Sequence, residues 1–181
     1  MTTVMRTGLT LAFCLALGAC SSMAPFPPHV LKDVNLNFDF NAWRAAPNAN
    51  EGRKVQIGGR VIQAEWTDRG TLIVGMQLPI VDHPAYGPSE PRRRTGVFEF
   101  AFLYPGKIEL GSLTPGNRFI VVGITQRSQT VTVEGAPKTE PYLIARCVHI
   151  WKTEGREISD FPEVGGGYYP LEENTYCAPG E

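Results

Sequence analysis

The sequence carries no excess of charge of either sign. Its 17 lysines and arginines face 18 aspartates and glutamates, which gives a formal net charge of -1. A domain that binds nucleic acid is expected to show a basic patch or a strongly positive balance, and this chain has neither. The composition therefore argues against nucleic acid or another polyanion as the partner.

The sequence also lacks the short motifs of the common enzyme classes. It contains no HExxH, CxxC, GxSxG or Walker sequence, the patterns that set metal ligands, redox thiols, nucleophiles or phosphate-binding backbone at a fixed spacing. Only three histidines are present, His29, His83 and His149, and they are far apart in the chain. We therefore predict no catalytic residues, no metal site and no enzymatic activity.

An apolar run of membrane-spanning length is missing near the N-terminus as well. The run from Leu9 to Leu17 has about nine residues, whereas a membrane-spanning helix needs roughly 20. Behind the basic Arg6, a run of this length is typical of a secretory signal. We expect residues 1–19 to be removed, and the remaining 162 residues (181 minus 19) suffice for one domain with a core.

The signal core ends in Leu17-Gly18-Ala19-Cys20, which resembles the lipobox of bacterial lipoproteins. In that pattern a peptidase cuts between Ala19 and Cys20, the Cys20 thiol takes a diacylglyceryl group, and the freed amine takes a further acyl chain. Two or more chains give a stable membrane anchor. The alternative is an ordinary signal cut after Ala19, with Cys20 there by chance. Serine rather than aspartate follows Cys20, which in such lipoproteins favours the outer membrane.

Two cysteines remain for the folded part of the chain. Cys147 and Cys177 would meet an oxidising periplasm, where disulfides persist. A bridge between them would close a loop of about 31 residues and stabilise the fold by roughly 3–4 kcal/mol. The sequence equally allows a buried free Cys147 and an exposed Cys177 in a loose tail, so this candidate disulfide stays open.

Turn-forming residues are frequent, with 19 glycines and 15 prolines, so long helices are not expected. Short runs rich in β-branched and aromatic residues alternate with these turns, which is typical of strands. We expect a mainly β domain with little helix outside the signal: a small antiparallel barrel of five to six strands, OB-like, with a β-sandwich as the alternative. The expected strands are 54–66, with a bulge or bend at Gly58-Gly59, then 71–80, 95–104, 118–128, 130–135 and 142–151, with turns at 68–70 and 126–129.

The segment before the first strand carries large apolar residues. We expect Phe38, Phe40 and Trp43 to dock on the core, and Asn41 to cap a short helical turn that ends before Pro47. The predicted organisation is a signal at 1–19, a proline-rich lipid-anchored tether at 20–34, the barrel at 35–152 and a partly ordered tail at 153–181.

Several segments are familiar as an ordered set: the lipobox, GRKVQIGGRVI at 52–62, LPI at 78–80, PRRRTGVFEF at 91–100, PGNRFIVVGIT at 115–125 and PYLIARCVHIW at 141–151. Together, over about 130 residues, they resemble the Slp family, the starvation-inducible outer-membrane lipoproteins of Gram-negative bacteria. YPGKIELGSL at 104–113 and the tail after Lys152 depart from the family pattern. The resemblance implies a periplasm-facing outer-membrane lipoprotein linked to stress or starvation, and it assigns no catalytic residues.

Two groups of residues are further candidates for a site. Cys147 and His149 lie two apart in a predicted strand, so their side chains share a face and could form half of a metal site; packing or pairing of Cys147 and a hydrogen bond from His149 to a neighbour is the simpler interpretation. Arg92, Arg93 and Arg94 form the densest charge cluster, which could contact lipid phosphates or peptidoglycan or be a solvated loop.

From the sequence we therefore expect a non-enzymatic outer-membrane lipoprotein that acts as a binding or structural module of the envelope. Its only attached group would be the covalent lipid on Cys20. The expected partners are the inner leaflet of the outer membrane and an envelope protein or peptidoglycan. The alternatives are a periplasmic metal-binding protein or enzyme centred on Cys147 and His149, and an accessory subunit of an envelope complex.

Overall fold

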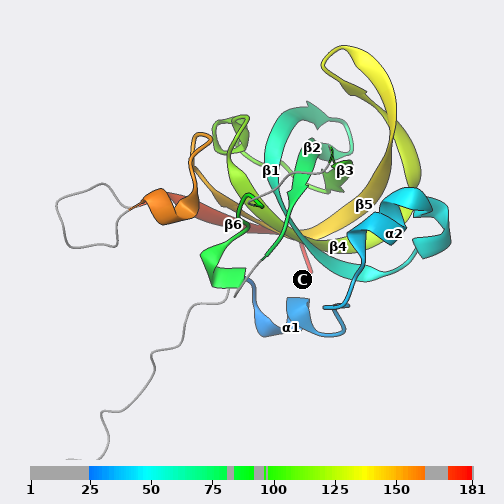
Figure 1. The fold of residues 1–181 in the computed structure, drawn as a ribbon, viewed down its shortest axis with the longest axis horizontal. Helices are drawn as coiled ribbons and strands as arrows, with labels where there is room; N and C mark the ends of the chain where they lie inside the picture. The colour runs from blue at the N-terminus through cyan, green and yellow to red at the C-terminus, as the bar shows by residue number, and fades with distance from the viewer. Residues whose placement is uncertain (1–24, 81–83, 92–95, 97, 162–170, 181) are drawn as a thin grey trace, which may run out of the picture.

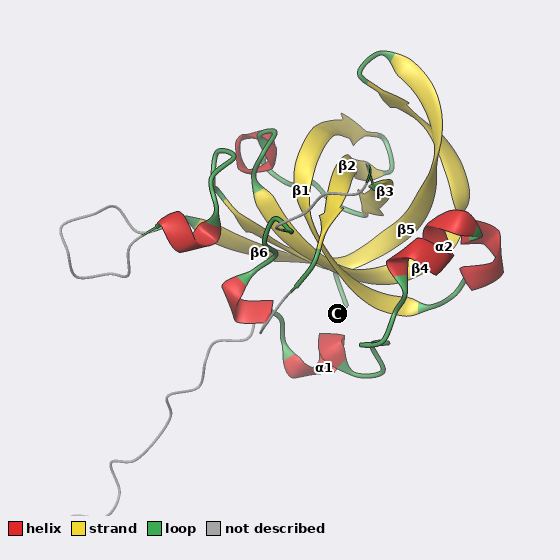
Figure 2. Cartoon of the chain, viewed as in Figure 1, coloured by secondary structure: helices red, strands yellow, loops and turns green. Residues whose placement is uncertain are grey.

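Six strands and two short α-helices make up the described part of the chain (Figure 2). The computed structural model describes residues 25–80, 84–91, 96, 98–161 and 171–180. None of the helices in these ranges is long and apolar enough to cross a membrane. The elements are α1 Pro28–Leu31, α2 Phe40–Ala45, β1 Lys54–Thr67, β2 Gly70–Leu78, β3 Glu99–Tyr104, β4 Arg118–Val133, β5 Ala136–Trp151 and β6 Glu173–Cys177, with the short 3-10 helices η1 Pro47–Asn50, η2 Pro84–Tyr86, η3 Leu110–Leu113 and η4 Ile158–Asp160.

Five of the strands close into a barrel. The strands follow the order β3-β2-β1-β4-β5-β6, and β5 also pairs in parallel with β3, where Ala101–Leu103 face Tyr142–Ile144 and close the ring (Figure 1). All other neighbours are antiparallel. This five-stranded ring is of the OB type. The expected mainly β, OB-like barrel is confirmed, with one parallel contact and with β6 added outside the ring.

Aromatic rings fill the barrel interior and pack against two glycines. Phe100, Phe102 and Phe119 are buried, with ring centroids between 5.1 and 6.0 Å apart. A Cβ atom at Gly59 would lie 2.6 Å from the Phe119 ring, and one at Gly75 would lie 2.5 Å from it. Strands β1 and β2 therefore carry glycine at the places where the ring from β4 needs the space.

Helix α2 packs its aromatic residues onto the same core. Trp43 is buried, and Phe38 and Phe40 pack against the cluster that contains it, as expected from the sequence. The expected cap at Asn41 was wrong. The Asp39 carboxylate accepts hydrogen bonds from two backbone N–H groups of the first turn, at 2.9 and 3.1 Å, because Asp39 occupies the N-cap position directly before the helix.

Strands β4 and β5 form one long hairpin that extends beyond the barrel. The turn expected at 126–129 was wrong, because β4 continues through this segment with a register irregularity. The Ser128 N–H donates to Asn48 Oδ1 at 2.9 Å, which holds the irregular segment on the N-terminal part of the chain. The turn lies at Glu134-Gly135, where φ is 50° and 82°, as in a two-residue type I′ turn.

The bulge expected at Gly58-Gly59 was also wrong. The register runs unbroken through both glycines, and the irregularity of the β1–β2 pairing lies between Val61 and Gln63. A Cβ atom at Gly58 would lie 2.8 Å from Pro88 Cβ. Glycine is needed here for the close approach of a neighbouring loop rather than for a bend.

Both flanking segments add layers to the outer face of β4 and β5. Phe26 and Val30 are buried in a cluster with Ile120 and Trp151, so packing on the barrel begins well before residue 35. In the tail, β6 pairs with β5, while residues 162–170 lie outside the described residues. The apolar outer faces of β4 and β5 explain this packing, since covering them removes apolar area from water.

Replacing Gly59 by alanine should destabilise the barrel. The new Cβ would meet the Phe119 ring and the backbone carbonyl of Met76, which lies 2.7 Å away. The ring has no free space to move into because it packs on Phe100 and Phe102. Overpacking of this kind costs about 1–3 kcal/mol, which urea denaturation followed by circular dichroism would measure.

Gly111→Ala is the matched control for this substitution. No heavy atom lies within 4 Å of a Cβ placed at Gly111, so the free energy of unfolding should change by less than about 0.5 kcal/mol. Equal losses of stability in the two variants would contradict the packing explanation.

Candidate functional site

The face that OB barrels commonly use for binding is covered by the protein's own hairpin. In OB barrels, the face formed by the second and third strands binds oligonucleotides or oligosaccharides together with adjoining loops. Here Val131 and Val133 from the hairpin tip are buried with Val74, Ala101 and Leu103 of β2 and β3. A candidate site must therefore lie elsewhere on this barrel.

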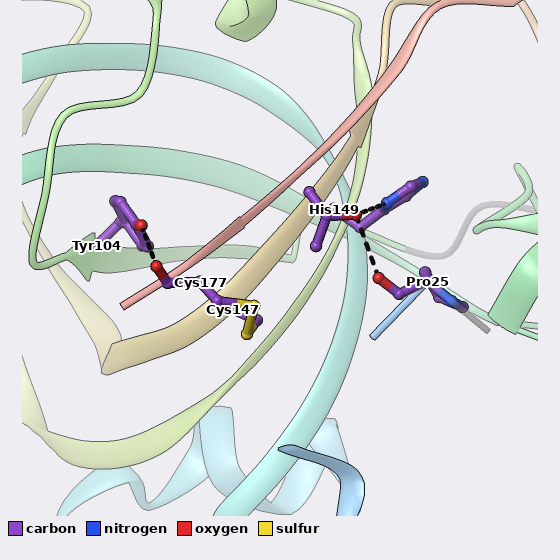
Figure 3. The surroundings of a disulfide bond; sticks show 6 residues. Pro25, Tyr104, Cys147, His149 and Cys177 are labelled. Atoms are coloured by element: carbon purple, nitrogen blue, oxygen red, sulfur yellow. Dashed lines mark hydrogen bonds between the residues drawn. A yellow bond between two sulfur atoms is a disulfide. The ribbon is translucent and has the colours of Figure 1, made fainter. Parts of the chain in front are cut away.

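Hydrogen bonds and a disulfide join the two ends of the described chain, at a place that we call the terminal seam (Figure 3). It forms because β6 pairs with β5 in an antiparallel register that sets Cys177 opposite Cys147 and Thr175 opposite His149. The terminal seam consists of Pro25, Phe26, Cys147, His149, Thr175 and Cys177.

Cys147 and Cys177 are bonded to each other as a disulfide. The sequence left this pairing open, and the register of β6 decides it, because the two Cα atoms lie 4.1 Å apart as direct strand partners. The Tyr104 hydroxyl donates to the Cys177 carbonyl at 2.7 Å (Figure 3). Burial raises the pKa of Tyr104, so its phenol keeps its proton and remains a donor. Both the disulfide and the Tyr104 hydrogen bond therefore hold the end of β6 on the barrel.

A second set of hydrogen bonds links His149 to the first described residue. The Thr175 hydroxyl donates to the Pro25 carbonyl at 3.2 Å and lies 2.6 Å from His149 Nδ1 (Figure 3). Since the hydroxyl has one proton and a carbonyl can only accept, His149 Nδ1 must carry a proton and donate to Thr175. The other ring nitrogen, Nε2, then faces the Glu173 carboxylate at 3.4 Å.

The surroundings of His149 favour the neutral ring. The imidazole packs edge-on against Trp151 at 4.2 Å and against Phe26 at 6.4 Å between ring centroids. Burial lowers the pKa of His149, and the Glu173 carboxylate opposes this effect only in part. Nδ1 therefore donates within the terminal seam, and the lowered pKa of His149 is the net result of burial and of the Glu173 carboxylate beside Nε2.

This geometry does not support a metal site or an active site centred on Cys147 and His149. The two residues lie in the same outer layer of β5, as expected, but the disulfide uses the thiol and Thr175 engages Nδ1. Within the described ranges, no group of three or more histidine, cysteine, aspartate or glutamate residues is placed to hold a metal ion. The function of the terminal seam is to hold the chain ends on the barrel.

A hollow of about 350 Å³ with a mixed polar and apolar wall lies between the N-terminal segment, β1 and β2. Its wall includes Ile80, which also packs against the cluster that holds Phe26 and Val30. Two glutamines, Gln56 and Gln77, line it, and the buried side-chain Nε2 of Gln56 has no hydrogen-bond partner in the described structure. Apolar lining residues are Leu36, Phe38, Phe40, Ile57, Leu78, Ile80 and Pro84.

A second, charged hollow of about 660 Å³ is lined by Arg44, Glu99, Lys138 and Glu140. The Lys138 ammonium donates to Glu99 Oε2 at 2.9 Å, and the Arg44 guanidinium lies 5.1 Å from the centre of the Phe98 ring. Burial and the neighbouring Glu99 raise the pKa of Glu140. Opposite charges largely balance within this hollow.

A buried guanidinium ties the loops near η2 and η4 to β4. Arg118 pairs with Glu157 at 2.5 Å and with Glu90 at 3.7 Å, and Glu90 also lies 3.5 Å from Arg60. Burial lowers the pKa of Arg118, although Glu157 opposes the shift. Glu90 is thus part of a structural ion-pair cluster.

Several predicted site residues lie outside the described residues: the cleavage and lipidation site at Ala19 and Cys20, and the cluster Arg92, Arg93 and Arg94. Conversely, the sequence did not predict the docking of Phe26 and Val30. The available signal was the apolar residues Phe26, Val30 and Leu31 in a short segment interpreted as tether, of which Val30 and Leu31 lie in α1 and Phe26 lies before it.

Loss of the disulfide should weaken the fold strongly. Cys177→Ala removes a disulfide between residues 30 apart in the sequence. A disulfide that closes a loop of this size stabilises the folded state by roughly 3–4 kcal/mol. Urea denaturation should show this loss, and dithiothreitol should reduce the stability of the wild type by a similar amount. The reductant should leave Cys177→Ala unchanged; a wild type that is indifferent to dithiothreitol would speak against the bridge.

Stability should depend on pH through His149. Its pKa is lowered in the folded state, so the unfolded chain takes up the proton first. The contribution of the neutral His149 ring to the free energy of unfolding is complete above about pH 6.5, the ordinary pKa of a histidine. It declines as the pH falls below that value. Urea midpoints between pH 5 and 8 should fall on acidification in the wild type and less so in His149→Gln.

Glu173→Gln provides a control for the direction of this effect. The carboxylate raises the pKa of His149 against the effect of burial, so its removal should make the decline below about pH 6.5 steeper. Parallel pH profiles for the wild type and His149→Gln would exclude His149 as the source.

The comparison with known families agrees with this architecture. The model of the outer membrane lipoprotein Slp family matches residues 17–176, from the first lipobox residue into β6. No curated protein and no solved structure matches the chain. Because the family match covers most of the sequence, including all five strands of the barrel, the chain belongs to the outer membrane lipoprotein Slp family.

Proposed function

We propose that the protein is a lipid-anchored, periplasm-facing module of the outer membrane that binds or supports envelope components without catalysing a reaction. The observation that carries this proposal is the lipobox Leu17–Cys20, whose cysteine stands five residues before Pro25, the first described residue, which is hydrogen-bonded to Thr175. Membership of an outer membrane lipoprotein family supports the location.

The anchor would be the acylated Cys20. A diacylglyceryl thioether and an acyl chain on the freed amine would insert into the inner leaflet of the outer membrane. Each additional chain adds about 0.8 kcal/mol per buried CH₂ group, so the set of chains holds the protein stably. No other attached group is needed for this function.

The polar groups of the terminal seam support a non-enzymatic function. Cys147 is in the disulfide, the His149 ring is buried and hydrogen-bonded, and burial favours its neutral form. The proposed partners are an envelope protein or peptidoglycan, with Arg92–Arg94 as candidate anion contacts, and a role under stress or starvation. Service as an accessory subunit of an envelope complex is compatible with this proposal.

The anchor can be tested by comparing the wild type with Cys20→Ser. The wild type should fractionate with the outer membrane, and its intact mass should fit removal of residues 1–19 plus acyl chains. Cys20→Ser should lack the acyl mass and leave the membrane fraction, because the thiol that takes the diacylglyceryl group is gone.

Ser21→Ala is the control, since it alters a neighbouring residue without removing the thiol, and it should remain acylated and membrane-bound. A wild type that is soluble and without acyl mass would overturn the proposed anchor and reopen an unanchored periplasmic function.

A further inference from the structure

We infer that one face of the barrel docks on the lipid surface that holds the anchor. We call this face the membrane face, and it consists of Leu36, Ile80 and Pro84, which line the hollow of about 350 Å³, and of Tyr86, which ends the helix η2 that Pro84 begins. The inference rests on the proposed acylation of Cys20. It adds an orientation and an interaction surface, with the lipid headgroup region and upper acyl chains as the partner.

The first support for this inference is the short length of chain between Cys20 and the barrel. Five residue steps separate Cys20 from Pro25, and five extended residues span at most about 18 Å. Pro25 is hydrogen-bonded to Thr175 and Phe26 is buried, so the chain is fixed to the barrel at that point. The edge of the barrel around Phe26 must therefore stay close to the lipid.

The second support is that large apolar side chains are exposed at that edge. Among the described residues, Leu36 is 82% exposed and Tyr86 is 69% exposed, more than the other exposed large apolar residues Trp66 and Leu110. Leu36 lines the hollow, and Tyr86 ends η2, whose first residue Pro84 also lines it. The two most exposed large apolar side chains of the described residues therefore lie on segments that contribute to the same hollow.

The position of the hollow connects these two observations. Its wall residue Ile80 packs against the cluster that contains Phe26 and Val30, so the hollow and the place where Phe26 fixes the chain share one edge of the barrel. Figure 1 shows α1 and the green helix η2 at this lower edge, with the tip of the β4–β5 hairpin at the opposite edge. A tyrosine beside aliphatic residues suits a membrane interface, where its ring is buried and its hydroxyl stays wet.

Tryptophan reporters in the full acylated chain would test the membrane face. The protein would be reconstituted into vesicles of phosphatidylethanolamine and phosphatidylglycerol, prepared with and without bromine on the acyl chains. Leu36→Trp and Tyr86→Trp should lose fluorescence to the brominated lipid and shift their emission to the blue. Both positions are exposed, so the substitutions should leave the fold intact.

Leu110→Trp is the matched control, because Leu110 is the other exposed leucine of the described residues, at 38% exposure, and lies on η3. Its fluorescence should be quenched no more than the wild-type background from Trp43, Trp66 and Trp151. Quenching of Leu110→Trp that equals or exceeds that of Leu36→Trp would overturn the inference.

Two further results would be equally decisive. A blue shift of Leu36→Trp without bromine quenching, together with a cross-linked dimer, would assign this face to a second copy of the chain and overturn the lipid surface. Acylated, vesicle-bound protein with no quenching at Leu36 or Tyr86 would refute the docking while leaving the anchor intact. Failure of the anchor itself would appear earlier, as missing acyl mass.

Discussion

The short parallel contact between β3 and β5 is the constraint on which the rest of the structure depends. Only Ala101–Leu103 and Tyr142–Ile144 take part, yet this contact closes the ring around Phe100, Phe102 and Phe119. Beyond it, the register of β5 shifts near Arg146, between Ala145 and Cys147. The strand can therefore pair with β3 before the irregularity and with β6 after it.

The terminal seam forms because β5 pairs first with β3 and then, further along the strand, with β6. Once β6 lies on β5, Cys177 meets Cys147 and Thr175 meets His149, and the same threonine bonds to Pro25. A single strand thus fixes both flanking segments of the domain. For a lipoprotein this matters, because the place where the N-terminal segment is fixed determines which side of the barrel the lipid can reach.

The hairpin gives this OB barrel a different outer surface from that of barrels that bind nucleic acid or sugars. Val131 and Val133 bury apolar area of β2 and β3 that an OB barrel commonly offers to a ligand. A shared topology therefore does not transfer the binding function. Among the hollows in the described part of the chain, the one lined by Leu36 and Ile80 lies on the same edge of the barrel as Phe26.

The sequence by itself determined the family, the mainly β barrel and most strand positions, because each depends on local composition and alternation, and it predicts the signal and the lipobox. It also placed Phe38, Phe40 and Trp43 on the core. Only the tertiary structure decided the turn at Glu134-Gly135, the Cys147–Cys177 bridge and the burial of Phe26. These features depend on contacts between residues far apart in the chain, such as β6 with β5, and the pattern within a single segment does not encode which distant strand will lie beside it.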